Sequence, residues 1–452
     1  MKIYYAIPVD TIKGKCLYDA KDNRIVPIPD NIYQMLVADS LTDELQAEFE
    51  QYARDHSIRN VLSDPGDIDI AHHWSGKDIK ENVDCHRKLL ILSITNKCNM
   101  NCTYCIYHSK FNQEENINHS MSLETAQKAI DQLLALSENT DTVHIGFYGG
   151  ESLIEIDFIR KCVDYSLAHS NGIPVTYGLT TNGLLLKNEG IRRFFEKYDF
   201  SIVVSLDGPR EINDRYRVDK QDRGVYDRVI KNLTEWYAES PDYVKNKVSI
   251  NAVEALPIPT KALDDFFSEF PIRYQFGEML ETDYFREHVC NASNAYRDKV
   301  IENKDQKFSE KHQENLITSF KNYVANGKGE LTGSIIPGGP CVPVYLRWYV
   351  NSKGDYYPCE RIDESEEFRI GNVDTGVDYD RIVKLYDNYI AVASKKCNGC
   401  WAMRLCGRCF KNINEDCTEL KERLARNMVY YIENIKDNKK AMKLIEEITY
   451  SY

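Results

Sequence analysis

The sequence has no long hydrophobic run and no excess of positive charge. No apolar stretch approaches the roughly 18–20 residues that a membrane-spanning helix needs. Lys and Arg number 57 against 70 Asp and Glu, which gives a formal net charge of −13, and the basic residues form no stripe. The first residues, MKIYYAIPVDTIKGK, place charges too close to the apolar stretch for an export signal. We therefore expect a cytoplasmic protein that binds neither membranes nor nucleic acids.

Cysteine, by contrast, is abundant and unevenly placed. Of 14 cysteines, three lie within 98–105, five within 397–417, and two more at positions 341 and 359. Without an export signal disulfides are not expected, and spacing this tight suits thiolates that converge on metal centres. The solitary cysteines are predicted to be buried core thiols: Cys16, Cys85, Cys162 and Cys290.

The region 86–330 alternates short apolar runs with amphipathic stretches. This pattern indicates parallel strands buried on both faces, as in an α/β barrel or a doubly wound sheet, where ligands collect at the carboxyl ends of the strands. The predicted strands are Leu89–Thr95, Val143–Tyr148, Val175–Thr181, Ser201–Leu206, Val248–Val253 and Ile272–Phe276. The predicted helices are Leu123–Leu136, Phe158–His169, Ile191–Tyr198, Val225–Ala238 and Lys261–Phe267.

Two smaller regions flank this one. Residues 1–85 predict a small α+β domain. Its expected elements are a strand at 2–8, a hairpin formed by 16–18 and 25–28, helices at 31–38 and 42–56, and a polar linker over 64–84. Residues 331–452 are rich in cysteine and, as far as 420, poor in helical periodicity, as expected where metal ligation replaces an apolar core. Surface helices are expected after residue 420.

The first predicted strand of the central region runs directly into a three-cysteine loop. Cys98, Cys102 and Cys105 have the spacing C-x3-C-x2-C. Three thiolates can ligate three irons of a [4Fe–4S] cluster and leave the fourth iron open to an outside ligand. A structural zinc site would need a fourth ligand, which no local cysteine or histidine supplies; we interpret His108 as a loop residue.

This loop resembles that of the radical S-adenosylmethionine (SAM) superfamily, whose signature carries an aromatic residue before the third cysteine, here Tyr104. The resemblance covers about residues 88–280 and implies a partial (β/α)6 barrel similar to a TIM barrel. It implies that a reduced cluster cleaves SAM and that a 5′-deoxyadenosyl radical then abstracts a substrate hydrogen. It also implies cofactor contacts from Tyr104, Gly149, Gly150, Glu151, Thr181, Asn182, Ser205, Asp207 and Arg217.

Two segments carry most of these implied contacts. Gly149-Gly150-Glu151 follows the second strand and matches the family's GGE motif. There the glycines let the backbone approach the cofactor, and Glu151 accepts a hydrogen bond from the methionyl amino group. The stretch from Asn213 to Arg217 is similar to the family's HDxxR segment, with Asn213 in place of His, so that Arg217 would bind the cofactor carboxylate. Tyr104 would lie near the adenine.

The C-terminal cysteines resemble the SPASM domain of peptide- and protein-modifying radical SAM enzymes. The resemblance implies two further [4Fe–4S] clusters, hence three in all. One would be held by Cys397, Cys400, Cys406 and Cys417, and the other by Cys341, Cys359 and Cys409. Two residues separate Cys406 from Cys409, where the family usually has three.

Residues 335–340 lack the extra cysteine found in members whose first auxiliary cluster is fully ligated. We therefore expect one iron of that cluster to be open to a substrate thiol. A zinc ribbon built from four of the tail cysteines is the alternative, but it would leave Cys341, Cys359 and Cys417 unexplained.

The resemblance implies a peptide maturase and leaves its product open. The first interpretation is a thioether-forming enzyme of the sactipeptide or ranthipeptide type, whose N-terminal domain, like a RiPP recognition element, binds a leader peptide by strand addition. The second interpretation is an enzyme that forms carbon–carbon crosslinks in a peptide. The third is an anaerobic sulfatase-maturing enzyme, where Glu360 after Cys359 stands in place of the usual Asp and is the candidate proton acceptor.

A non-enzymatic iron–sulfur electron carrier is the remaining alternative, and it would not need the strand-end residues. The expected partners of the enzyme are a precursor peptide with a leader sequence and a reducing electron donor such as flavodoxin or ferredoxin.

Overall fold

The structure, a computed structural model, describes residues 4–38, 42–56, 58, 68–86, 89–105, 107, 119–137, 140–254, 260–278, 334–337, 347–437, 439 and 442. The chain divides into two compact units. The terminal unit comprises Met1–Ser75, Gln313–Val342 and Val383–Tyr452, and the barrel unit comprises Gly76–His312 and Pro343–Ile382. The domain ranges 1–85, 86–330 and 331–452 stay a prediction about sequence modules, because each compact unit is assembled from non-consecutive pieces.

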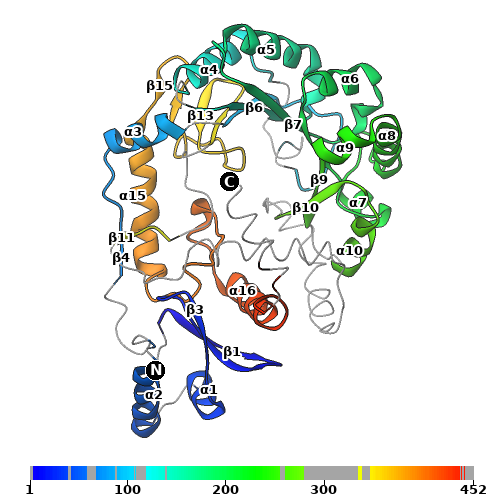
Figure 1. The fold of residues 1–452 in the computed structure, drawn as a ribbon. Coiled ribbons are helices and arrows are strands. Elements are labelled where there is room, and N and C mark those ends of the chain that lie inside the picture. The colour runs from blue at the N-terminus through cyan, green and yellow to red at the C-terminus, as the bar shows by residue number, and fades with distance from the viewer. Residues whose placement is uncertain are drawn as a thin grey trace. The chain divides into compact units, whose positions relative to one another are not determined.

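The barrel unit is built on one ten-stranded sheet, of order β10-β9-β8-β7-β6-β5-β12-β13-β14-β15. Its parallel strands β5 to β10 follow one another in sequence order, with α4 to α10 along one side of them (Figure 1). Their bounds are β5 (Leu89–Thr95), β6 (Val143–Gly149), β7 (Val175–Thr181), β8 (Ser201–Ser205), β9 (Val248–Glu254) and β10 (Arg273–Glu278). This confirms the predicted α/β class and its six parallel strands.

The five helices predicted in this region are found, with bounds within two residues of the prediction, and two further helices, Arg210–Tyr216 and Pro241–Lys247, were not predicted. Their bounds are α4 (Leu123–Ala135), α5 (Ile156–His169), α6 (Glu189–Lys197), α7 (Arg210–Tyr216), α8 (Tyr226–Glu239), α9 (Pro241–Lys247) and α10 (Thr260–Ser268). Helix α4 illustrates the cause. Ser122 Oγ accepts the Thr125 N–H at 3.0 Å and caps the helix, and Ala126, Ala129, Ile130 and Leu133 recur at helical spacing on its buried face.

Other elements of the structure were not expected, among them four strands and two helices. Strand β12 (Arg347–Val350) pairs in parallel with β5, and β13 (Asp355–Tyr357), β14 (Gly371–Asn372) and β15 (Gly376–Val377) continue the sheet antiparallel. Helix α3 (Gly76–His86) occupies much of the predicted linker over 64–84, so that prediction was wrong. The expectation of little helix before 420 was also wrong: α15 (Tyr379–Lys396) buries Ile382, Leu385, Tyr386, Tyr389 and Ala393 at helical spacing.

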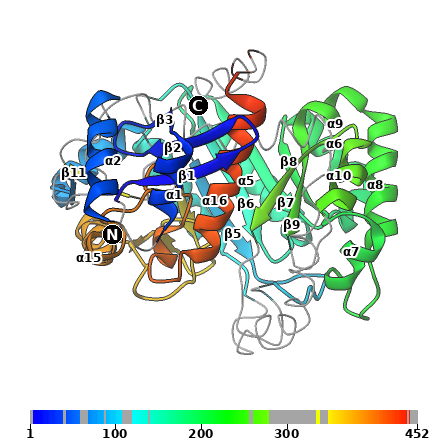
Figure 2. The ribbon, with the colours of Figure 1, turned by 90° about the horizontal axis from the view of Figure 1, so that it is seen from below.

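The terminal unit contains the antiparallel sheet β1-β2-β3, which has a core on each face. The strands are β1 (Ala6–Thr11), β2 (Gly14–Asp19) and β3 (Arg24–Pro27), followed by α1 (Asp30–Val37) and α2 (Asp43–Asp55). Leu17 and Ile28 pack with the two helices, whereas Tyr5 and Tyr18 pack with residues from the C-terminal part of the chain. Figure 2 shows α16 (Thr418–Tyr430) alongside β1.

The remaining elements of the terminal unit are short. Strand β4 (Asp69–Ile70) pairs in parallel with β11 (Ser334–Ile335), and a π-helical turn (Tyr431–Ile435) continues α16. The strand expected at 2–8 begins later, at Ala6, while the predicted hairpin and both predicted helices are found.

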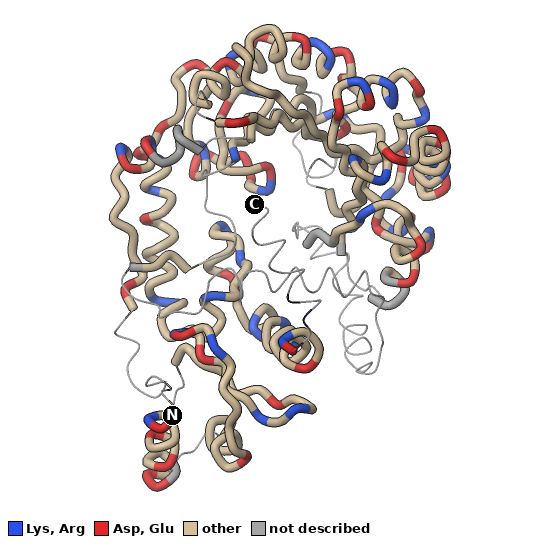
Figure 3. The backbone as a smooth tube through the Cα atoms, viewed as in Figure 1, with Lys and Arg blue, Asp and Glu red and all other residues tan. Residues whose placement is uncertain are grey.

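No helix in the described part of the chain is both long and apolar enough to span a bilayer. Along the outer helices of the barrel unit, basic and acidic residues alternate and do not gather into stripes of one sign (Figure 3).

Candidate active site

The three-cysteine loop follows β5 and keeps its thiols close together. Cys102 is buried, and Cys98 and Cys105 are half-buried. Burial raises the pKa of Cys98 and Cys102 to about 12 and that of Cys105 to about 11, and electrostatic interaction among the thiols adds to each shift. Backbone N–H groups of Met100 and Tyr107 donate to Cys98 Sγ and Cys105 Sγ, each at 3.4 Å. Such donors stabilise thiolates when a metal replaces the protons.

On one side, the loop rests against the end of β6 through backbone contacts. The N–H of Gly150 donates to Thr95 O and the N–H of Glu151 donates to Lys97 O, both at 2.8 Å. A Cβ on Gly149 would come within 2.2 Å of Thr95 O, and one on Gly150 within 2.4 Å of Lys97 O. Only glycine allows this approach, so the Gly-Gly pair fixes where the cysteine loop begins.

On its other side, the loop pairs with the segment that follows α7. The N–H of Asn101 donates to Val218 O at 2.8 Å, and that of Thr103 donates to Tyr216 O at 3.0 Å. Cys102 lies between these two positions, so backbone hydrogen bonds on both sides of it set its place.

Glu151 is buried among the strand ends. Its Oε1 accepts the Thr181 hydroxyl at 2.8 Å and the Leu153 N–H at 3.0 Å, and its Oε2 accepts the Asn182 N–H at 2.7 Å. Burial raises the pKa of Glu151, and the three hydrogen bonds act in the opposite direction. The carboxylate thereby joins the ends of β6 and β7.

Asn182 brings the end of β7 to the cysteine loop. Its Nδ2 donates to Asn99 Oδ1 at 2.7 Å and lies 3.9 Å from Cys98 Sγ. Ser205 ends the neighbouring strand β8, in register with Asn251 of β9. The predicted site residues from β6, β7 and β8 therefore share the carboxyl edge of the sheet.

Tyr104, Asp207 and Arg217 form a buried polar group at the same edge. Asp207 Oδ2 accepts the Tyr104 hydroxyl at 2.6 Å and Arg217 Nε at 2.8 Å. The Arg217 guanidinium also lies over the Tyr104 ring, 5.5 Å from its centroid. One face of Tyr104 is therefore covered by an arginine.

Glu360 is placed beside an arginine that the sequence did not suggest. Arg347 Nη1 donates to Glu360 Oε1 at 2.8 Å and to Oε2 at 3.0 Å. Arg347 stands on β12, and the parallel pairing of β12 with β5 fixes its position.

The sequence also gave no indication of a polar chain beside Cys105. The Tyr107 and Tyr349 hydroxyl oxygens lie 3.5 Å apart, and the Tyr349 hydroxyl donates to Glu364 Oε1 at 2.8 Å. Tyr349 stands on β12, whose short run Arg-Trp-Tyr-Val was the available signal of a strand.

In the terminal unit, four tail cysteines line one cavity of about 200 Å³: Cys397, Cys400, Cys406 and Cys417. Burial raises the pKa of Cys397 to about 12, and electrostatic interaction with the other three thiols adds to it. Cys409 is exposed and does not line the cavity. Cys359 is buried in the barrel unit, whereas Cys341 lies outside the described residues.

These donor sets fit iron–sulfur clusters. Within the described residues, no three acidic, cysteine or histidine side chains are placed as ligands of one ion. A [4Fe–4S] cluster makes a different demand, because each of its thiolates binds a different iron and the ligands stand further apart. The loop offers three thiols and the tail cavity four, which are the donors that such clusters use.

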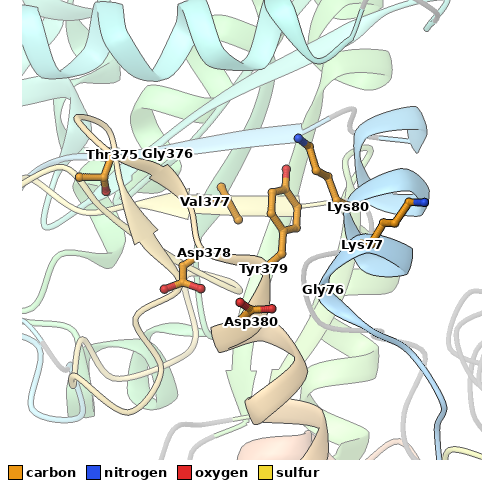
Figure 4. A pocket seen from close by; sticks show the side chains of 9 residues that line it. All are labelled: Gly76, Lys77, Lys80, Thr375, Gly376, Val377, Asp378, Tyr379 and Asp380. Atoms are coloured by element: carbon orange, nitrogen blue, oxygen red, sulfur yellow. The ribbon is translucent and has the colours of Figure 1, made fainter.

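A larger depression, of about 510 Å³, lies elsewhere in the barrel unit, as Figure 4 shows. It is lined by the start of α3 and by the segment 375–380, with Lys80 Nζ 6.0 Å from the centroid of the Tyr379 ring. No cysteine and no predicted site residue lines it, so we do not assign the chemistry to it.

Comparison with known proteins points to the region of the cysteine loop and the strand ends. Residues 92–246 match the radical SAM superfamily model. A cysteine-type anaerobic sulfatase-maturating enzyme of Clostridium novyi is 33% identical over 32% of this chain and 39% of its own length. The radical SAM cyclopropyl synthase TigE of Paramaledivibacter caminithermalis is 30% identical over 35% of this chain and 34% of its own. The chain thus spans about two fifths of the first curated relatives it matches.

Among solved structures, native anSMEcpe with bound AdoMet superposes with a TM-score of 0.56. It is 19% identical, and the match covers 81% of this chain and all of that one. The same protein has been solved with AdoMet and the Kp18Cys peptide, with a TM-score of 0.51, 20% identity and coverage of 75% and 99%. At this identity the likeness establishes the fold. Residues 92–246 of the chain are thus similar to the radical SAM superfamily.

We predict that Gly150→Ala displaces the cysteine loop, because the added Cβ would meet Lys97 O at 2.4 Å. The anaerobically reconstituted variant should lose about four irons per chain, those of one [4Fe–4S] cluster. Iron analysis and electron paramagnetic resonance of the reduced protein measure the loss. Gly146→Ala is the control, since its Cβ would only touch Ile91 at 3.5 Å. Full iron content in Gly150→Ala would contradict the role assigned to the Gly-Gly pair.

Proposed function

We propose, on the basis of the similarity to the radical SAM superfamily, that this protein is a peptide maturase that forms thioether crosslinks in a ribosomally made precursor. The crosslink would join a cysteine sulfur to a carbon of another residue. The observation that carries the proposal is the three-thiol loop held beside Glu151, Asn182 and Arg217 at the carboxyl edge of the sheet. When bound, SAM and a [4Fe–4S] cluster supply a 5′-deoxyadenosyl radical, which takes a hydrogen atom from the substrate.

The chain's own residues would bind and orient the cofactor. Within the described residues, Arg217 uses only Nε in hydrogen bonds, so both Nη groups remain for the cofactor carboxylate. Glu151 Oε2 accepts one bond there, from the Asn182 N–H, and a carboxylate oxygen has room for a second, from the cofactor amino group. Cys98, Cys102 and Cys105 would each bind one iron.

The tail cysteines would hold two auxiliary clusters. Cys397, Cys400, Cys406 and Cys417 are proposed for one, which the shared cavity supports. Cys341, Cys359 and Cys409 are proposed for the other, with one iron open to a substrate thiol. Such a cluster would orient the cysteine that becomes the thioether and accept the electron released when the bond forms. A flavodoxin or ferredoxin of the cytoplasm is the proposed source of electrons.

Glu360 is the proposed proton acceptor. Crosslinking removes two hydrogens from the peptide: one leaves as the atom taken by the radical, the other as a proton and an electron. Arg347 Nη1 donates to both oxygens of Glu360 and fixes the orientation of this carboxylate.

The sheet of the terminal unit is the proposed docking site for a leader peptide. Strand β3 is an edge strand. The Ile28 N–H donates to Lys15 O across the β2–β3 pair. Along an antiparallel strand, residues alternate between hydrogen bonding to the partner strand and pointing their backbone groups away from it. The N–H and C=O of Ile25, three residues before Ile28, therefore point away from β2. Pro27 has no N–H and its carbonyl already accepts the Tyr52 hydroxyl, which limits strand addition to the residues before it.

Sulfatase maturation is the second candidate. The sequence relation to a sulfatase-maturating enzyme favours it, whereas Glu360 stands where such enzymes usually carry Asp. It acts on one cysteine or serine of a protein and would not need the peptide-binding sheet.

The deciding experiment incubates the reconstituted enzyme anaerobically with SAM, a reductant and a cysteine-containing peptide. The peptides are the precursor encoded next to the gene and a synthetic cysteine peptide from a sulfatase. We expect mass spectrometry to detect the precursor with two hydrogens and one alkylatable thiol lost. Loss of two hydrogens with every thiol alkylatable would establish a carbon–carbon crosslink instead. Conversion of the sulfatase peptide alone would establish the second candidate, and no change in either would refute a peptide maturase.

Two controls use the same assay. A precursor without its leader should be modified more slowly, because it cannot pair with β3. Glu360→Gln should lower the yield of crosslinked peptide but not that of 5′-deoxyadenosine. The matched variant Glu366→Gln changes an exposed carboxylate paired with Arg369 and Arg381, and it should behave as the wild type.

A further inference from the structure

Asp207 connects four segments of the chain. It follows β8 directly and is only 1% exposed. Besides Tyr104 and Arg217, it accepts the Val253 N–H on Oδ1 at 2.9 Å, and its own N–H donates to Asn213 Oδ1 at 3.2 Å. One side chain thus ties the cysteine loop, the end of β9 and the segment after α7 to the end of β8.

The hydrogen-bonding capacity of this carboxylate is nearly consumed by the protein. Each carboxylate oxygen has about two acceptor sites. Tyr104 and Arg217 fill both sites of Oδ2, and Val253 fills one of Oδ1. Oδ2 therefore has no acceptor site left for a cofactor hydroxyl or amino group, and the burial of Asp207 leaves little access to the remaining site.

Arg217, by contrast, is held in place while, within the described residues, only one of its guanidinium nitrogens donates a hydrogen bond. Its Nε is bound to Asp207 and its guanidinium carbon lies 5.5 Å from the centroid of the Tyr104 ring, so two contacts hold the guanidinium in place. An unheld arginine would have to give up the freedom of a long side chain on binding an anion. The contacts with Asp207 and Tyr104 already order the Arg217 side chain in the folded protein, so this loss of freedom does not occur on binding.

We infer that Asp207 is a positioning residue and not a ligand of the cofactor: with Tyr104, it holds the Arg217 fork where it meets the carboxylate of SAM. This inference rests on the proposed function, because it assumes that SAM binds at this edge of the sheet. It assigns Asp207 a different role from the direct contact that the family resemblance implies. It also couples carboxylate binding to the cysteine loop, since Tyr104 lies between Cys102 and Cys105 in the chain.

The test compares SAM with decarboxylated SAM, which lacks only the carboxylate that Arg217 would meet. Dissociation constants are measured by anaerobic isothermal titration calorimetry on the reconstituted wild type and on Asp207→Asn. We expect Asp207→Asn to weaken SAM binding by roughly tenfold, the effect of losing one charge-assisted bond. For decarboxylated SAM the dissociation constant should change by less than about threefold, because this ligand lacks the carboxylate that Arg217 would bind.

A milder variant keeps the test valid if Asp207→Asn fails to fold, which circular dichroism and iron content would reveal. Tyr104→Phe removes one hydroxyl bond to the carboxylate. It should cause a smaller loss with the same preference for SAM, and the double variant should bind no more weakly than Asp207→Asn. Asp227→Asn, which alters the exposed pair with Arg210, is the control and should bind both ligands as the wild type does.

Each other result overturns the inference. Equal losses for the two ligands would place Asp207 against the adenosine part of SAM. Unchanged SAM binding in both Asp207→Asn and Tyr104→Phe would remove any role in positioning. Failure of the wild type to bind SAM would refute the proposed function itself, and it is distinguishable because it does not depend on position 207.

Discussion

The site depends on a close contact between two pieces of backbone. Gly149 and Gly150, at the end of β6, lie against the carbonyls of Thr95 and Lys97 at a distance that no side chain permits. Because the cysteine loop starts at this contact, its thiols are positioned by the sheet and not by the loop's own sequence. The pairing of Asn101 and Thr103 with the segment after α7 completes the support from the opposite side. Backbone hydrogen bonds on both sides of the loop therefore position its three thiols.

Most of the barrel unit could be predicted from the sequence because its signals are local. A strand buried on both faces reads as a continuous apolar run, and Leu89–Thr95 and Val175–Thr181 have the predicted bounds. Glycines and polar residues at the ends of such runs identified the site. The signal of α15 was also local, a buried stripe at helical spacing, but the nearby cysteines obscured it.

The partners of the side chains could not be predicted in the same way. Arg347 meets Glu360 only because the four-residue strand β12 joins the sheet beside β5, a pairing with no signal in the intervening sequence. Likewise, Arg217 was expected to face the cofactor, and its ion pair with Asp207 follows from how the segment after α7 packs. Long-range pairing of polar groups depends on the complete fold, which a motif does not encode.

We propose that the loop of Cys98, Cys102 and Cys105 holds one cluster and that the tail cysteines hold others independently. Mössbauer spectroscopy of ⁵⁷Fe-reconstituted protein, with and without SAM, tests it most directly. In the wild type, one component of the spectrum should change when SAM is added. In the variant with all three loop cysteines changed to alanine, that component alone should disappear, with about four irons lost per chain. A SAM-sensitive component that survives in this variant would contradict the account.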